Sequence, residues 1–384
     1  MFEVFDSLID QEQVVALLKE AIVASRDSKD ESQSMTHAWL FTGPPGSGRS
    51  NAALAFGAAL ICPEAGCGTC VNCRTAIAGT HADIELLRTE GLSIKIDEIR
   101  ELIIRASWSP SVATYRVVII EDADRLTESA ANALLKGIEE PGMRTVWLLC
   151  APTLTDVLPT IRSRTRNLVL RTPSVSAVAQ LLEMEGVLPK PALFAARVSQ
   201  GHVGRARQLA NNSQTRELRL AILRFPLAIS DIASAFRAAQ LLVEAAKKEA
   251  EGESERRDAI ETGQLKEAWG QQGSKLTQGG SKAVKELEKE QKSRATRMVR
   301  DYLDRALLDL ATLYRDVLLA QTEGISLEEM AINLDLLEEI KQLALRTTAE
   351  STLRRIDAIM QARMNLSKNS NSLLTIEALM VALK

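Results

Sequence analysis

A glycine-rich loop at residues 43–50, Gly-Pro-Pro-Gly-Ser-Gly-Arg-Ser, constrains the fold of this chain more than any other feature of the sequence. An apolar run typical of a short strand precedes it at residues 38–42, and an Ala- and Leu-rich run typical of a helix follows at residues 51–61. Strand, glycine turn and helix in this order form a phosphate-binding loop, in which backbone N–H groups and the helix N-terminus hold phosphate oxygens. The sequence therefore predicts a nucleotide site, with ATP and Mg²⁺ as candidate ligands, made of Gly43, Pro44, Pro45, Gly46, Ser47, Gly48, Arg49 and Ser50.

Arg49 is the one departure from the pattern G-x-x-x-x-G-K-[ST], which requires Lys at that position. Arg keeps the positive charge, but its planar guanidinium is bulkier and cannot act as a compact point charge on the β- and γ-phosphates. The glycine backbone remains, and the hydroxyl of Ser50 can still hold Mg²⁺. The loop thus favours nucleotide binding with weak or absent hydrolysis. A glycine-rich turn without a ligand is the alternative, which the flanking strand and helix disfavour.

A second nucleotide element is expected where the β-branched run at residues 116–120 ends in Glu121 and Asp122. Carboxylates at such a strand end hold Mg²⁺ and polarise the attacking water. Their usual order is Asp then Glu, and the inverted order shifts both carboxylates by about an ångström, which catalytic geometry tolerates poorly. For this strand taken alone, two solvated acids remain the alternative. We therefore predict a degenerate catalytic pair.

Strands alternate with helices in the first part of the chain and then stop. Further strand-like runs lie at residues 82–87 and 145–151, and helix-like runs lie at residues 96–104 and 129–139. This alternation predicts a parallel sheet that is covered by helices on both faces. After about residue 171 the pattern is helical only.

The helical part divides further by its composition. Three short helices separated by Gly and Pro are expected up to residue 212, and longer helices are expected from residue 213 to residue 384. Residues 247–292 interrupt the longer helices with charges of both signs, several glycines and few apolar anchors. We predict a mobile insertion there.

Four of the five cysteines fall within twelve residues, in the spacing C-x4-C-x2-C-x2-C. Four thiolates this close suit one tetrahedral Zn²⁺, and a closed shell of four thiolates leaves no position for a catalytic water. The sequence therefore predicts a structural zinc site, rather than disulfides or buried free thiols, at Cys62, Cys67, Cys70 and Cys73. Cys150, in a predicted buried strand, is interpreted as a core residue.

Charge and hydropathy exclude two classes of function. The chain has 47 Lys and Arg against 50 Asp and Glu, a formal charge of −3, which excludes a protein that coats nucleic acid by bulk electrostatics. Any contact with DNA is then local or shared with partner subunits. No run approaches 18 apolar residues, so no membrane span is expected. The first residues carry acids and no apolar segment follows them, which predicts a cytoplasmic protein.

Taken together, these motifs resemble those of the bacterial DNA polymerase III clamp-loader family. The similarity rests on the strand–loop–helix order followed by the four-cysteine module, and on Ser163-Arg164-Thr165, where the family has Ser-Arg-Cys. Residues 5–11 and 37–42 are similar to the N-terminal box and first strand of the family. The resemblance implies an α/β AAA+ module over residues 1–171 with the zinc module inserted at residues 62–73. A helical lid at residues 172–212 and an all-α collar domain at residues 213–384 would follow.

The resemblance also implies a function, partners and a role for Arg164. The subunit would help to load the sliding clamp onto primed DNA, as part of the DNA polymerase holoenzyme, together with the gamma/tau and delta subunits. Arg164 would act in trans as an arginine finger, because a guanidinium can pair with γ-phosphate oxygens of a neighbour's ATP. Arg49 and the inverted acids favour a member with little or no ATPase. So does Gly204, which stands where hydrolytic members carry a sensor Arg.

Three alternatives remain open from the sequence. The chain could be a gamma/tau-like subunit that hydrolyses ATP, or another AAA+ ATPase of DNA replication or repair, such as a helicase-type motor. It could also be a zinc-bearing interaction protein with a vestigial nucleotide site, and Arg164 could be an ordinary surface residue. An ATP-binding assay separates the interaction protein from the others, and an ATPase assay separates the motors from a subunit that does not hydrolyse ATP.

Overall fold

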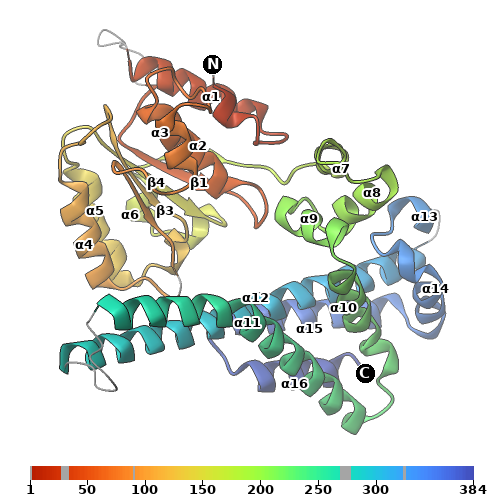
Figure 1. Ribbon diagram of the computed structural model, residues 1–384. Helices are drawn as coiled ribbons and strands as arrows, with labels where there is room; N and C mark the ends of the chain where they lie inside the picture. The colour runs from red at the N-terminus through yellow and green to blue at the C-terminus, as the bar shows by residue number, and fades with distance from the viewer. Residues whose placement is uncertain (1, 27–33, 90, 269–277, 323–325) are drawn as a thin grey trace. The chain divides into compact units, whose positions relative to one another are not determined.

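A computed structural model of the chain describes residues 2–26, 34–89, 91–268, 278–322 and 326–384. The chain divides into two compact units, Met1–Asn211 and Asn212–Lys384. The first holds a sheet with its covering helices and then three short helices, and the second is helical throughout its described residues (Figure 1). None of the described helices combines the length and the apolar character that a membrane span requires.

The first unit is built on a five-stranded sheet with the strand order β2-β3-β4-β1-β5. All of the neighbouring strands are parallel, as the alternation of strands and helices predicts. The strands are β1 (Ala38–Thr42), β2 (Ile84–Leu87), β3 (Arg116–Ile120), β4 (Thr145–Ala151) and β5 (Arg166–Val169). The strand β5 is not among the predicted strands, because it is an edge strand of four residues in which Leu168 alone is buried.

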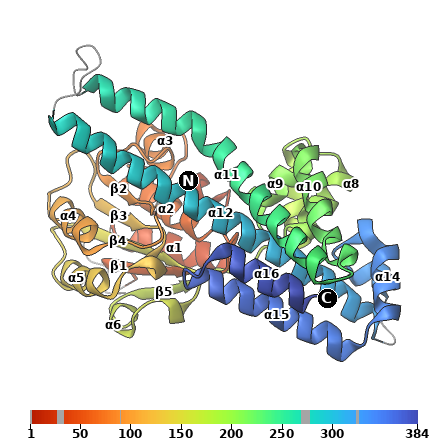
Figure 2. The ribbon, with the colours of Figure 1, turned by 90° about the horizontal axis from the view of Figure 1, so that it is seen from below.

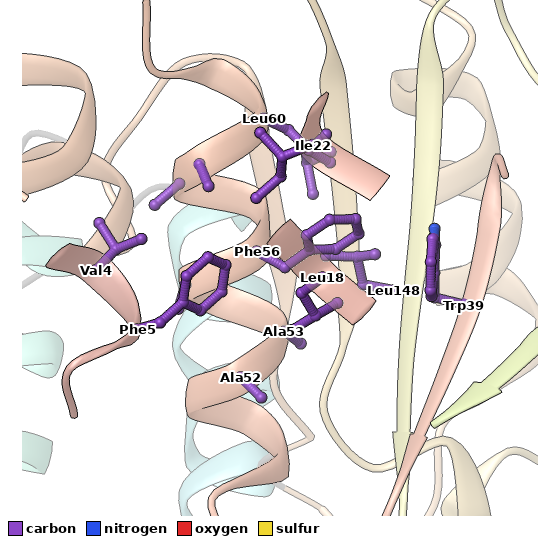
Figure 3. Close-up of a cluster of buried hydrophobic side chains, with 14 of the residues drawn as sticks. Val4, Phe5, Leu18, Ile22, Trp39, Ala52, Ala53, Phe56, Leu60 and Leu148 are labelled. Carbon is purple, nitrogen blue, oxygen red and sulfur yellow. The ribbon is translucent and has the colours of Figure 1, made fainter. Parts of the chain in front are cut away.

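Helices cover both faces of this sheet because successive side chains of each buried strand point to opposite faces. On one face, Trp39 and Phe41 of β1 join the core formed with α1 and α2, and Phe56 of α2 packs edge-on against Trp39 at 5.1 Å between ring centroids. Figure 3 shows Phe56 and Leu18 beside Leu148 of the sheet. On the other face, Leu40 joins the core formed with α4 and α5. The helices of this part are α1 (Glu12–Ala24), α2 (Arg49–Ile61), α3 (Val71–Ile77), α4 (Ile96–Ala106), α5 (Glu128–Glu139) and α6 (Pro159–Arg162).

The three short helices expected after the sheet are present. Ser174 caps the first of them by accepting a hydrogen bond from the backbone N–H of Ala177, and Pro189 begins the second. Gln11 and Asp10, from the start of the chain, hydrogen bond to the backbone of Arg171 and Ser174 and thereby tie this region to the N-terminal segment. The helices are α7 (Val175–Met184), α8 (Pro189–Val198) and α9 (Val203–Asn211).

The second unit packs around one apolar core of Leu, Ala and Ile residues, with a polar network buried beside it. Arg219 of α10 is 3% exposed and lies 3.5 Å from Asp309 and 3.3 Å from Asp335. These carboxylates offset the cost of burying a guanidinium. The α-helices are α10 (Ser213–Arg224), α11 (Ile232–Ala268), α12 (Gln278–Ala320), α13 (Leu327–Met330), α14 (Leu337–Arg346), α15 (Ala349–Ser367) and α16 (Ser372–Ala382).

The charged segment at residues 247–292 differs from the expected interruption of the helices. It is helical over residues 247–268 and 278–292, where it continues α11 and α12, and residues 269–277 lie outside the described part of the chain. Figures 1 and 2 show the two helices side by side. Arg294 of α12, 6% exposed, bonds to Asp258 and Glu261 of α11. Polar contacts between the helices thus replace the apolar anchors whose scarcity suggested an insertion.

Asp83, immediately before β2, fixes the connection between α4 and β3. Its buried carboxylate accepts hydrogen bonds from the backbone N–H groups of Ser111, Val112 and Ala113 at 2.6, 2.8 and 2.8 Å. Burial alone would raise the pKa of Asp83, but the three N–H groups outweigh burial and lower the pKa below the ordinary value. The connection is therefore ordered by the buried carboxylate of Asp83, which also lies 4.0 Å from the buried guanidinium of Arg116.

We expect the substitution Asp83→Asn to lower the free energy of unfolding by about 2–3 kcal/mol, because hydrogen bonds to a charged group are weakened inside the fold. Urea unfolding followed by tryptophan fluorescence measures this loss. Asp97→Asn is the matched control, since the Asp97 side chain is 81% exposed, and its effect should stay within about 0.5 kcal/mol. Equal effects of the two substitutions would contradict the role assigned to Asp83.

Candidate nucleotide and metal sites

The glycine-rich loop lies at the carboxyl ends of β1 and β4, where open parallel sheets bind ligands. The backbone N–H of Gly43 points to the carbonyl oxygens of Ala151 and Pro152 at 3.3 and 3.2 Å, which fixes the start of the loop on β4. Gly46 and Gly48 have φ values of 89° and 85°, a conformation that favours glycine, and α2 begins directly after Gly48. The loop therefore has the strand, turn and helix start of a phosphate-binding loop.

The side chain of Arg49 points back to the start of the glycine-rich loop. Its Nη1 donates a hydrogen bond to the carbonyl oxygen of Gly43 at 2.9 Å, so the guanidinium joins the two ends of the loop. The hydroxyl of Ser47 is buried and has no hydrogen-bond partner among the described residues. The unsatisfied hydroxyl of Ser47 fits an oxyanion, whereas the guanidinium of Arg49 already has a partner within the fold.

The acids at the end of β3 lie near the same loop, as the sequence predicts. Burial is the main cause that raises the pKa of the Cys150 thiol, the charges of Glu121 and Asp122 raise it further, and Arg49 lowers it. The glycine-rich loop and the end of β3 therefore both lie close to the buried sulfur of Cys150. Glu121 also pairs with Arg88 at 3.1 Å, and Asp122 lies 4.0 Å from Arg125.

Asp124 is a third acid at this end of the sheet, which the sequence analysis missed. Burial raises its pKa above the ordinary value, the neighbouring charge of Asp122 raises it further, and Arg125 and Arg49 act in the opposite direction. The sequence Glu-Asp-Ala-Asp at residues 121–124 contains this signal, but only the fold shows that Oδ1 of Asp124 is buried without a hydrogen-bond partner among the described residues.

His202, another residue that the sequence analysis did not select, lies directly against the loop. A Cβ atom added to Gly46 would come within 2.6 Å of both Cα and Cβ of His202. His202 precedes α9, and its Nδ1 accepts a hydrogen bond from the backbone N–H of Arg205 at 3.2 Å. The first turn of α9 and the middle of the glycine-rich loop are therefore in contact, and the expected sensor position, Gly204, lies within this turn.

The four clustered cysteines meet between the end of α2 and the start of α3. Their sulfur atoms all lie within 4.8 Å of one another, and Sγ of Cys62 is 3.7 Å from Sγ of Cys67 and from Sγ of Cys70. Tetrahedral zinc with Zn–S bonds of about 2.3 Å places its sulfur ligands about 3.8 Å apart. The residues present therefore fit a zinc ion, and the sequence prediction that Cys62, Cys67, Cys70 and Cys73 act together agrees with this geometry.

Backbone donors surround the cysteine cluster and favour thiolates. The N–H groups of Glu64, Cys70 and Cys73 donate to Sγ of Cys62, Cys67 and Cys70 at 3.3, 3.4 and 3.4 Å. The N–H groups of Cys70 and Thr69 lower the pKa of Cys67 to about 6. Burial raises the pKa of Cys73, whose side chain has no contact with water.

Arg26, at the end of α1, supports the cysteine cluster from outside. It donates to the carbonyl oxygen of Pro63 at 2.6 Å and to that of Cys62. These contacts fix the first cysteine at the end of α2, and such outer partners orient the ligands of a metal site.

The structure places Arg164 apart from the loop residues, in the connection from α6 to β5. Its Nε lies 2.5 Å from Oε1 of Glu139, and its Nη1 donates to the carbonyl oxygen of Thr160 at 3.0 Å. The side chain is 42% exposed and borders a polar pocket of about 510 Å³. The pocket is lined by Glu20, Ser34, Thr36, Ser163, Arg164, Thr165 and Arg166.

Comparison with known proteins associates this chain with one group of replication proteins. Residues 18–174 match the family described as DNA polymerase III, delta subunit. The DNA polymerase III subunit delta' of Bacillus subtilis is 28% identical over 344 residues, which cover 89% of this chain and 88% of the relative.

Two further matches are shorter or more distant. The DNA polymerase III subunit gamma/tau of Mycobacterium tuberculosis is 33% identical over 199 residues, but these cover 50% of this chain and 33% of that protein. A solved structure of a gamma subunit-related protein from Thermotoga maritima covers 93% of this chain at 18% identity, with a TM-score of 0.35, and is itself covered completely.

We expect the purified chain to carry one zinc ion, and Cys73→Ser to remove it, because a three-thiolate remainder no longer closes the coordination shell. Structural zinc contributes about 10–16 kcal/mol to small zinc peptides. Cys62 and Cys73 belong to the core on one face of the sheet, but the core on the other face contains none of the four cysteines, so loss of metal should loosen residues 62–73 without unfolding the chain. Metal analysis and limited proteolysis measure the two effects.

Cys150→Ala is the control for this prediction, since it removes a buried thiol outside the cluster and should leave the zinc content unchanged. A wild-type protein that contains no zinc, when purified under reducing conditions, would overturn the assignment.

Proposed function

We infer that this chain, which belongs to the DNA polymerase III delta' family, is the delta' subunit of a clamp loader and helps to load the sliding clamp onto primed DNA. The observation that carries this conclusion is the match to a delta' subunit over 89% of this chain and 88% of that protein. The gamma/tau match, by contrast, covers half of this chain. The assignment as a delta' subunit also agrees with the departures from the family's ATPase motifs, which favour a subunit that does not hydrolyse ATP.

The proposed domains follow from the family. Residues 1–171 would form the AAA+ module, residues 172–212 the lid and residues 213–384 the collar through which the loader subunits assemble. The division of the chain after Asn211 supports a separate helical domain at the C-terminus. Partners would be the gamma/tau and delta subunits, with the clamp and primed DNA reached through the assembled complex, in the cytoplasm at the nucleoid.

A structural role for the cysteine cluster is part of the proposal. Zinc held by Cys62, Cys67, Cys70 and Cys73 would crosslink the end of α2 to α3 and would supply no catalytic step. The sulfur distances and the N–H donors around them support this assignment.

Loss of ATPase activity is the second part of the proposal, and three features support it. Arg49 bonds to Gly43 within its own loop, the acids at the end of β3 stand in inverted order, and Gly204 stands where hydrolytic members of the family carry a sensor Arg. Backbone donors and Ser50 remain for a nucleotide.

We expect the isolated chain to show no ATP turnover above the protein-free background in a phosphate-release assay with Mg²⁺. Each of the three features weakens a separate catalytic part, so a single reversal such as Arg49→Lys should not restore turnover. A clear Mg²⁺-dependent activity that Ser50→Ala abolishes would favour the gamma/tau-like alternative instead.

The role of Arg164 is the third part of the proposal. An exposed guanidinium beside a polar pocket that is also lined by Arg166, with Glu20 as the acid among the lining residues, gives an excess of positive charge that suits an oxyanion. We assign to Arg164 the γ-phosphate of ATP bound to an adjacent loader subunit.

We expect Arg164→Ala to reduce DNA-stimulated ATPase and clamp loading by the reconstituted loader, with zinc content and assembly unchanged. Arginine fingers contribute about 10³–10⁵ in rate at the site that they serve, but the total loss is smaller because the other ATP sites do not depend on this residue. Arg49→Ala should have little effect. The reverse order, with Arg49 dominant and Arg164 silent, would mean that the chain is a motor serving its own site.

A further inference from the structure

Glu139, the last residue of α5, is the acid that holds Arg164. Its Oε1 lies 2.5 Å from Nε of Arg164, across 25 residues of sequence. We propose that Glu139 is a positioning residue for Arg164, and that it orients the guanidinium so that the outer edge of this group meets a nucleotide phosphate of the adjacent subunit. This inference rests on the role proposed for Arg164 and adds to it the residue on which its geometry depends.

The hydrogen bonds of Arg164 leave one edge of the guanidinium for an incoming anion. Glu139 takes Nε, while Nη1 donates to the carbonyl oxygen of Thr160 at 3.0 Å and to the hydroxyl of Ser163 at 3.3 Å. None of the described residues accepts a hydrogen bond from Nη2. A guanidinium has five N–H donors in a fixed plane, so fixing Nε and one hydrogen of Nη1 also fixes the direction of the remaining edge.

Glu139 can serve as an anchor because the end of α5 is itself held in place. Leu134 and Ile138 of this helix are fully buried in the core beneath the sheet. The carbonyl oxygen of Ile138 is 2.9 Å from Nε2 of His37, the residue before β1. The acid is therefore fixed to the same framework as the sheet, whereas Arg164 lies in a connection between two short elements.

The pocket beside Arg164 brings a second positive charge close to its guanidinium. This pocket is also lined by Arg166, which stacks over Trp39 at 4.9 Å from the ring centroid. The acid among its lining residues, Glu20, accepts a hydrogen bond from the hydroxyl of Ser34 at 2.7 Å, so two guanidinium groups stand against one carboxylate that already has a partner. Glu139 is not among the lining residues, so the carboxylate that orients Arg164 does not line this pocket.

The ion pair is too exposed to be explained by stability. The side chains of Arg164 and Glu139 are 42% and 47% exposed, and pairs of this kind contribute little to folding because water and salt screen them. Removal of Glu139 should therefore leave the fold intact and change the orientation of Arg164 alone.

The experiment compares Glu139→Ala, Glu140→Ala, Arg164→Ala and the double variant Glu139→Ala/Arg164→Ala in the complete loader with clamp, primed DNA and ATP. Glu140 is the matched control, because it is an exposed acid at the next position. We expect Glu139→Ala to lower kcat of the DNA-stimulated ATPase about three- to fivefold at unchanged KM, a loss of the size expected for one exposed ion pair. Glu140→Ala should behave as wild type, and Glu139→Ala should have no further effect in the Arg164→Ala background.

The outcomes separate this inference from the proposed function. If Arg164→Ala lowers the ATPase while Glu139→Ala leaves kcat unchanged or raises it, Glu139 does not position Arg164 and the inference fails alone. An effect of Glu139→Ala that persists in the Arg164→Ala background would also overturn it. If Arg164→Ala is silent, the finger role fails, and the inference fails with it.

Discussion

The packing of α2 against the sheet is the interaction on which both candidate sites depend. Its first residue, Arg49, belongs to the glycine-rich loop. Cys62, which directly follows its last residue, is the first of the clustered cysteines. Between them the helix is buried almost throughout, with Phe56 against Trp39 and Gly57 so close to the sheet that an added Cβ would lie 3.2 Å from Val117. The close packing of this helix against the sheet therefore fixes the positions of the loop and of the cysteines relative to the strands.

Local patterns were sufficient for the parts of the molecule whose residues are neighbours in sequence. The glycine-rich loop, the strands β1 to β4 and the cysteine cluster each lie within a short stretch, so spacing alone predicts them. The family resemblance supplied the rest of the functional interpretation, and the similarity to a delta' subunit over most of the chain supports it. The missed features either have a weak local signal or depend on partners far apart in the chain. Leu168 gives β5 too weak a signal, His202 meets Gly46 across the first unit, and Arg294 finds its acids on another helix.

The glycine-rich loop combines the backbone of a phosphate-binding loop with altered side chains. Its glycines keep the conformation that the turn requires, and its first residue remains bonded to β4. What differs is the chemistry added to this backbone, with Arg49 bonded to Gly43 and three acids of unequal burial opposite it. Such a loop holds the sheet and α2 in register whether or not it carries a ligand. The exposed Arg164, rather than this loop, is the feature on which the proposed function depends.

The position of β1 in the sheet has a consequence for how the protein is made. This strand is the first to leave the ribosome, yet its two neighbours, β4 and β5, are the last strands of the sheet to be synthesised. The hydrogen bonds of Gln11 and Asp10 likewise form only after Arg171 and Ser174 have been synthesised. Until then the apolar strand Ala38–Thr42 has an open edge on both sides, the type of segment that chaperones recognise and that aggregates in their absence. The four cysteines, by contrast, emerge together and can take up metal while the sheet is still incomplete.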